Sequence, residues 1–223
     1  MFILLSYPLG TKTPLFGTNP PNVFKKIESI EKGDHCNSSL ITFFNHNGTH
    51  IDAPRHFDAK GKKIVDFDIE DFIFESPRLI EIPKEEDETI GIDDMLENES
   101  DIQTCDLLLI RTGFHKKRGK KSYVERNPWI DNGAASFIRK QRHLKAIGID
   151  AVSVSSFFHL DIGEETHRIL LVSDLHPSKP KLIIEDMNLS ANLKGLRRVF
   201  VIPLFMNGAD SAPCTVFAEV ECD

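Results

Sequence analysis

Cysteine, long apolar runs and signal-peptide features are scarce or absent in this sequence. Its 223 residues include only four cysteines, and no two of them form a C-x-x-C pair. Such isolated cysteines are typical of free thiols in a reducing cytosol, with a disulfide or a cysteine metal site as the alternative. No apolar run approaches the roughly 18 residues of a membrane helix, and the start, Met1 to Leu5, lacks a basic segment. We therefore expect a cytoplasmic protein without a membrane partner.

Positive charge is scarce as well. The chain has 27 Lys and Arg against 34 Asp and Glu, which gives a formal net charge of −7. Broad nucleic-acid binding needs a cationic surface, so we expect no nucleic-acid partner. Hydrophobic residues make up 40% and charged residues 27%, the ordinary mixture of a globular protein with a sizeable core. The length suits one large domain or two small ones.

Short apolar or β-branched segments predict more strands than helices. The predicted strands are 2–5, 39–44, 79–82, 107–111, 151–154, 182–185, 199–204 and 216–220. The predicted helices are 132–145, 163–171 and a short acidic helix at 92–98. Because strands outnumber helices and do not alternate strictly with them, the pattern indicates an α+β fold with a mixed, barrel-like β-sheet and flanking helices.

Histidine is the one residue type that is concentrated. Four of the nine histidines fall within 22 residues: His35, His46, His50 and His56. His46 and His50 are four residues apart, and Asp52 follows two residues later. Two imidazoles and one carboxylate form a ligand set suited to Zn²⁺ or Mn²⁺. Loop histidines that only hydrogen-bond to the backbone are the alternative interpretation.

The local sequence around these residues predicts a strand followed by a loop. An apolar segment, 41–44, precedes the cluster, and Gly48 and Pro54 argue against a helix. Gly48 allows the backbone to fold so that the two predicted ligands on either side of it converge. If the chain were extended, His50 and Asp52 would point to the same side.

The stretch HNGTHIDAPRHF, residues 46–57, resembles the signature H-x-G-T-H-x-D-x-P-x-H-F of the cyclase family of metal-dependent hydrolases. That family includes bacterial kynurenine formamidase and isatin hydrolase. Weaker matches follow in the family's order at LSYPL (5–9), LIRTGF (109–114), GIDAVSV (148–154), IPL (202–204) and GADSAP (208–213). Since these matches extend over nearly the entire chain, we expect one domain over residues 1–223, and the resemblance implies a swivelling β/β/α architecture.

The resemblance also implies the remaining site residues. A His and a Glu that complete the family's metal site match His167, in HRILL, and Glu185, in IIE. From the residues alone, a carboxylate at the end of an apolar run costs several kcal/mol unless it is paired or bound to metal. We therefore expect one or two Zn²⁺ ions, or one Mn²⁺ ion. The predicted ligands are His46, His50, Asp52, His167 and Glu185, with Asp52 and Glu185 bridging two ions.

Family resemblance and sequence order agree on His56 as the general acid/base. It lies past the ligands, close enough to exchange a proton with water or a leaving group. Three departures from the family leave the metal number and the substrate open: an apparent insertion at 173–179, Ser155 in place of Asp, and Thr215 in place of Arg.

We expect a metal-dependent hydrolase that cleaves a small amide-type bond in an arylformamide or a cyclic amide. A metal-dependent cyclase or dehydratase, which is a lyase, and a non-catalytic metal- or ligand-binding relative are the alternatives. Phe43 and Trp129 are candidate substrate contacts, and the basic segment 115–121 is either a solvated loop or an anion-binding lid. The resemblance implies a homodimer or a higher homo-oligomer.

Overall fold

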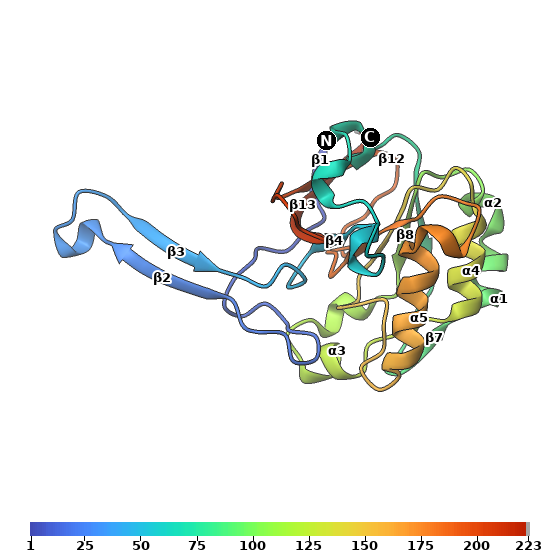
Figure 1. Cartoon of the computed structure of the whole chain (residues 1–223), viewed down its shortest axis with the longest axis horizontal. Coiled ribbons are helices and arrows are strands. Elements are labelled where there is room, and N and C mark those ends of the chain that lie inside the picture. Colours follow the sequence, from blue (N-terminus) through green and yellow to red (C-terminus); the bar gives the residue numbers. More distant parts are fainter. Residues whose placement is uncertain (222–223) are drawn as a thin grey trace.

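The computed structural model describes residues 1–221 and contains one mixed, nine-stranded sheet (Figure 1). Its strand order is β5 (Ile73–Phe74), β12 (Leu196–Pro203), β13 (Ser211–Val220), β4 (His50–Asp52), β11 (Leu182–Glu185), β10 (Ala146–Ile149), β8 (Leu107–Arg111) and β6 (Pro77–Glu81), while β1 (Phe2–Leu4) pairs with β13. Strands β6, β8, β10 and β11 run parallel, and the other pairs are antiparallel. Because β12 also approaches β6, the sheet curls towards a barrel.

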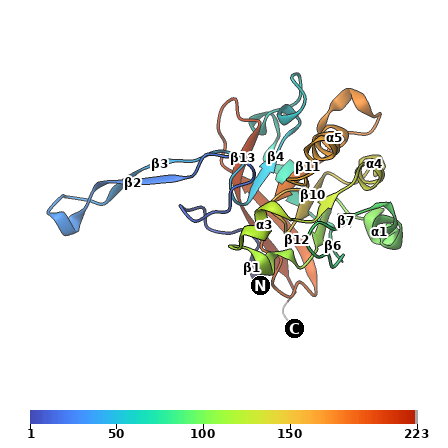
Figure 2. The same ribbon diagram turned by 90° about the horizontal axis from the view of Figure 1, so that it is seen from below.

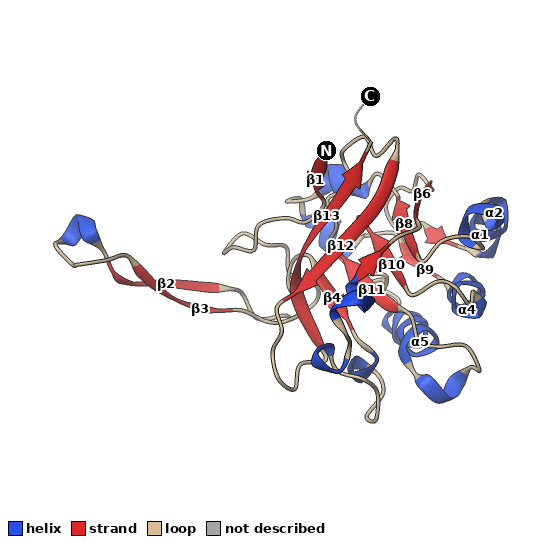
Figure 3. Ribbon diagram, turned by 90° about the horizontal axis from the view of Figure 1, so that it is seen from above, coloured by secondary structure: helices blue, strands red, loops and turns tan. Residues whose placement is uncertain are grey.

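Helices cover one side of this sheet, as Figures 2 and 3 show. They are α1 (Ile92–Glu97), α2 (Glu99–Ile102), α4 (Asn132–Lys140) and α5 (Leu160–Leu171); α3 (Lys121–Glu125) begins at the last residue of the basic segment. The core between helices and sheet includes Ile138, Leu170 and Ile183, and the core inside the curled sheet includes Ile51 and Ile184. Asp131 caps α4 by accepting a 2.7 Å hydrogen bond from the Ala134 amide.

A long β-hairpin projects away from the sheet and its helices (Figures 1 and 3). It consists of β2 (Val23–Glu28) and β3 (Ser38–Thr42), which pair only with each other among the described strands. A second small pair, β7 (Thr89–Ile90) with β9 (Trp129–Ile130), is parallel. None of the helices within residues 1–221 is long and apolar enough to cross a membrane.

The predicted mixed, barrel-like sheet with flanking helices is confirmed, with three local corrections. The strand expected at 151–154 is wrong, because the chain pairs at Ala146–Ile149 and leaves the sheet at Asp150. The helix expected to reach residue 145 ends at Lys140, where Gln141 adopts an extended backbone. The metal-ligand stretch, expected in a loop, contains the buried strand β4, which pairs with both β11 and β13.

Candidate metal centre

Strand register brings the candidate ligands together at β4 and β11. In this antiparallel pair His50 lies opposite Glu185, and Asp52 lies opposite Ile183. The two-residue period of β4 directs His50 and Asp52 to the same face. His46 comes from the loop before β4, His56 from the short 3-10 helix Pro54–His56, and His167 from the buried side of α5. All of these residues except His50 line one cavity of about 460 Å³.

Backbone carbonyls determine which nitrogen of two histidines carries the proton. His50 Nδ1 lies 2.8 Å from the Gly48 carbonyl, and His167 Nδ1 lies 2.9 Å from the Gly163 carbonyl. A carbonyl only accepts, so both Nδ1 atoms donate and both Nε2 atoms present lone pairs. His50 Nε2 lies 3.4 Å from Glu185 and 3.5 Å from Asp52, and His167 Nε2 lies 3.6 Å from Glu185 and 3.9 Å from Asp52. The Nε2 lone pairs of His50 and His167 are therefore both close to the carboxylates of Asp52 and Glu185.

Asp210 orients the third imidazole. Its Oδ2 lies 3.0 Å from both His46 Nε2 and His56 Nδ1, while Asn45 donates to its Oδ1 at 2.9 Å. His46 Nδ1 then faces Asp52 Oδ1 at 3.0 Å. Burial raises the pKa of Asp210, but the two histidine hydrogen bonds outweigh it and lower that pKa below its usual range.

Asp52 is the centre of this arrangement and lacks hydrogen bonds of its own. His50 Nε2 and both carboxylate oxygens of Asp52 are buried without a hydrogen-bond partner among the described residues. Burial would raise the pKa of Asp52, yet the charges of His50 and His46 lower it well below the usual range. Burial likewise opposes protonation of His46, and Asp52 and Asp210 overcome this and raise its pKa to about 10. Because both Asp52 oxygens are buried without a hydrogen-bond partner among the described residues, the charged carboxylate needs a cation beside it.

A divalent metal ion meets that requirement. The donor atoms form two groups within 4.8 Å, one of His46, Asp52 and His56 and the other of His50, Asp52 and Glu185. Imidazole nitrogen and carboxylate oxygen are ordinary ligands for Zn²⁺ and Mn²⁺. Glu185 is held in place because its Oε1 accepts hydrogen bonds from the Ser153 hydroxyl at 2.9 Å and the Val154 amide at 2.8 Å.

The structure brings all six predicted polar site residues together, but it places the predicted aromatic contacts elsewhere. Phe43 does not line the cavity; its neighbour Phe44 does, because adjacent residues of an extended chain face opposite sides. Trp129 is buried beside His159, with ring centroids 5.5 Å apart, and is also absent from the lining. Phe16 and Phe57 supply the other aromatic walls.

The structure also places the departures from the family pattern and the basic segment 115–121. Ser155 Oγ lies 3.0 Å from His167 Nδ1, whereas Thr215 lines a different hollow. Residues 173–179 are absent from the cavity lining. In the basic segment, Arg118 forms a bidentate pair with Asp186 and Lys117 contacts Glu85, so these cations are already paired and do not form a lid over the cavity.

Comparisons with known proteins agree with this geometry. The family model named Cyclase matches residues 3–156. Kynurenine formamidases from Bacillus cereus and Bacillus anthracis are each 27% identical over 212 residues, covering 95% of this chain and 94% of each relative.

Solved structures share the fold. Isatin hydrolase A from Labrenzia aggregata, bound to benzyl benzoate, superposes with a TM-score of 0.81 at 20% identity, covering 99% of this chain and 93% of that one. A predicted metal-dependent hydrolase from Bacillus stearothermophilus gives a TM-score of 0.76 at 24% identity, covering 98% and 97%. With a family model that matches most of its length, a metal-ligand signature at the centre of the sheet and a shared fold, this chain belongs to the Cyclase family.

Proposed function

We propose that this protein is a metal-dependent hydrolase that cleaves a small amide-type C–N bond, in an arylformamide or a cyclic amide. The observation that carries this proposal is Asp52, a buried carboxylate that demands a cation and lies beside three imidazoles in an open cavity. The names of its relatives, kynurenine formamidase and isatin hydrolase, support the same class of substrate.

The proposed ligands divide between two ion positions. His46, His50 and Asp52 would hold one ion, Asp52 and Glu185 would bridge, and His167 would complete the second position. Asp52 belongs to both donor groups, which supports a bridging role. Zn²⁺, as one or two ions, or Mn²⁺ suits these nitrogen and oxygen donors. Such an ion supplies Lewis-acid activation of water and of the substrate carbonyl.

His56 is proposed as the proton carrier. Its Nδ1 lies 3.0 Å from Asp210 Oδ2, so this nitrogen donates and Nε2 is left to accept a proton. The side chain is 27% exposed, and its ring centroid lies 4.1 Å from that of His46. His56 is therefore beside the ligands yet open to the cavity, where it can take a proton from water and return it to the leaving nitrogen.

Two other functions use the same residues. A cyclase or dehydratase would use His56 to remove a proton from carbon, and a binding protein would not need His56 at all. The aspartate-oriented imidazole at the cavity favours turnover over binding alone, because metal retention requires no such pair.

Metal-loaded protein assayed with N-formylkynurenine, isatin, formanilide, lactams and esters tests the proposal. We expect cleavage of an amide substrate and a rate loss on the order of 10²–10⁴ in His56→Ala with the metal retained. Tight ligand binding without turnover on any of these substrates would refute hydrolysis and favour the binding protein. Elimination products would favour the lyase.

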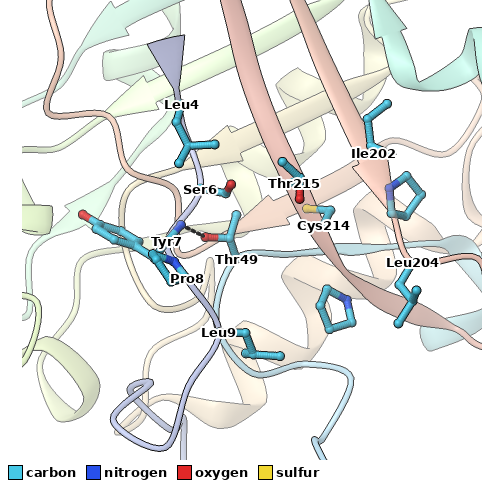
Figure 4. Close-up of a pocket in the computed structure, with 12 residues that line it drawn as sticks. Leu4, Ser6, Tyr7, Pro8, Leu9, Thr49, Ile202, Leu204, Cys214 and Thr215 are labelled. Atoms are coloured by element: carbon cyan, nitrogen blue, oxygen red, sulfur yellow. Dashed lines mark hydrogen bonds between the residues drawn. The ribbon is translucent and has the colours of Figure 1, made fainter. Parts of the chain in front are cut away.

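The projecting hairpin supports a homodimer. Six large apolar side chains on this arm are each 42–58% exposed: Val23, Phe24, Ile27, Ile30, Leu40 and Ile41. An isolated two-stranded hairpin is marginally stable in water, so this arm needs a cover. We propose that it packs on a second copy, in the hollow of about 470 Å³ that Leu4, Ile202 and Leu204 line (Figure 4).

The area that such packing would bury supports a dimer. At roughly 150 Å² for a large side chain, the six residues expose roughly 450 Å² per arm. Two arms and two receiving surfaces then bury roughly 1,800 Å², within the range of about 1,200–2,000 Å² for stable interfaces. We further propose that residues 1–223 act as one domain in a reducing cytoplasm, consistent with the free thiols of Cys36, Cys105 and Cys214.

A further inference from the structure

The wall of the cavity away from the ligands carries one acidic side chain, Glu164. Leu160, Glu164 and His167 all line the cavity. Their spacing of four and three residues puts them on one face of α5. Glu164 precedes His167 by three residues, so its position along the helix axis is about 4.5 Å farther from the proposed metal ligand. A substrate whose scissile amide lies at the ligands therefore shares the cavity with this carboxylate.

Glu164 also differs from the other carboxylates of the cavity in having no partner. Asp52 and Glu185 face the proposed metal and the imidazoles, and Asp210 contacts two histidines. Glu164 forms no hydrogen bond or ion pair with any residue from 1 to 221. Its neighbour Glu165, in contrast, lies 3.7 Å from Arg168. The carboxylate of Glu164 is therefore available to a ligand.

Apart from the histidines at the proposed ligand site, the described part of the lining offers no cationic side chain to a negatively charged substrate group. Among the described residues, no Lys or Arg lines the cavity. Phe16, Phe44 and Phe57 offer apolar walls to an aromatic ring, and the uncompensated charge beside them is negative. A substrate carboxylate at this end would meet like charge without a counterion, whereas an ammonium group would gain one.

We propose that Glu164 is a specificity-determining residue that selects aryl amides carrying a positively charged amine on the ring, away from the scissile bond. This inference rests on the proposed amide hydrolysis and adds the charge of the substrate to it. The aryl ring packs between the phenylalanines, the amide reaches the ligands, and the ammonium group donates to the Glu164 carboxylate.

Three formanilides test the selectivity: the unsubstituted compound, an aminomethyl derivative and a carboxymethyl derivative, each charged one made with ortho, meta and para substitution. For the best-placed isomers, we expect wild-type protein to favour the ammonium over the carboxylate substrate in kcat/KM on the order of tenfold at low salt. A single exposed charge pair changes an equilibrium only a few-fold, and attraction and repulsion both add to this ratio. The ratio should shrink at high salt, because screening weakens both effects.

Glu164→Gln should bring the ratio to within about twofold, and Glu164→Lys should invert it. Glu165→Gln is the matched control: it removes the same charge one residue away, outside the cavity lining, and should leave the ratio unchanged. A wild-type ratio near one, or an unchanged ratio in Glu164→Gln, overturns the inference.

Calorimetric binding of the corresponding substituted anilines separates this inference from the proposed reaction. Preference for the ammonium-bearing aniline that disappears in Glu164→Gln supports the selectivity even when no formanilide is cleaved. Failure to cleave all of the formanilides, by contrast, counts against the proposed hydrolysis alone. Cleavage of the unsubstituted formanilide without any charge preference keeps the hydrolysis and refutes the role of Glu164.

Discussion

Asp210→Asn removes the group that orients two histidines at once. The Oδ2 atom of Asp210 lies 3.0 Å from His46 Nε2 and 3.0 Å from His56 Nδ1. As long as Oδ2 accepts both protons, His46 Nδ1 faces Asp52 and His56 Nε2 is free to take a proton. An amide in place of the carboxylate removes the negative charge and cannot reliably accept from both rings. The substitution therefore disturbs a ligand and the proton carrier together.

The effect of Asp210→Asn on metal affinity and its effect on reaction rate differ in size. Loss of a group that orients a metal ligand typically weakens metal affinity by about 10–100-fold. Loss of correct acid/base function costs on the order of 10²–10⁴ in rate. We therefore expect weaker binding in a competition titration with a chromogenic chelator and, at saturating metal, a kcat reduced by at least about 100-fold.

A graded control is available at Asn45, which donates to the other oxygen of Asp210 at 2.9 Å. Asn45→Ala keeps the negative charge, so its effects should have the same direction and be several times smaller. If Asp210→Asn binds metal like the wild type and retains kcat within about threefold, Asp210 does not orient these histidines and the reasoning is refuted.

Three further predictions concern the metal, pH and assembly. Asp52→Asn and His50→Ala should each lower the bound metal per chain in elemental analysis, and unchanged stoichiometry in both variants would contradict the ligand assignment. In chelator-treated protein, the raised pKa of His46 contributes stability that is complete below pH 6.5 and is lost as pH rises through 10. Urea unfolding should therefore show a decline of a few kcal/mol over this window, since one pKa unit corresponds to about 1.4 kcal/mol, and His46→Gln should flatten it. Finally, charging the arm with Leu40→Lys and Ile41→Lys should convert a dimer to a monomer in light scattering, whereas the control Lys26→Glu on the same arm should not; a monomeric wild type would contradict the proposed dimer.

Most strands and the buried faces of the helices were predictable because each follows from a local apolar pattern. Leu107–Arg111 and Leu182–Glu185 match the predicted ranges at both ends. The strand His50–Asp52 was not predictable in this way, because its residues are polar ligands that would be costly to bury without a partner. Tertiary pairing with β11 and β13 explains it, since a central strand has its backbone hydrogen bonds satisfied on both edges. The hairpin strand Val23–Glu28 was not predicted, because its apolar residues, Val23, Phe24 and Ile27, do not alternate and two lysines interrupt them.

The site residues also divide into those that a local sequence pattern indicates and those that only strand pairing brings into the site. His46, His50, Asp52 and His56 lie within one short stretch, so their spacing alone indicated metal chemistry. Asp210 is 154 residues beyond His56, and only the pairing of β13 with β4 places it there, since Ser211 lies opposite Asp52 in that register. A signal was present in GADSAP, one of the weaker matches to the family, which contains Asp210. A carboxylate one residue before a strand that pairs with a ligand-bearing strand lies at the edge of the metal site, so sheet register, and not spacing along the chain, is the rule that would have found it.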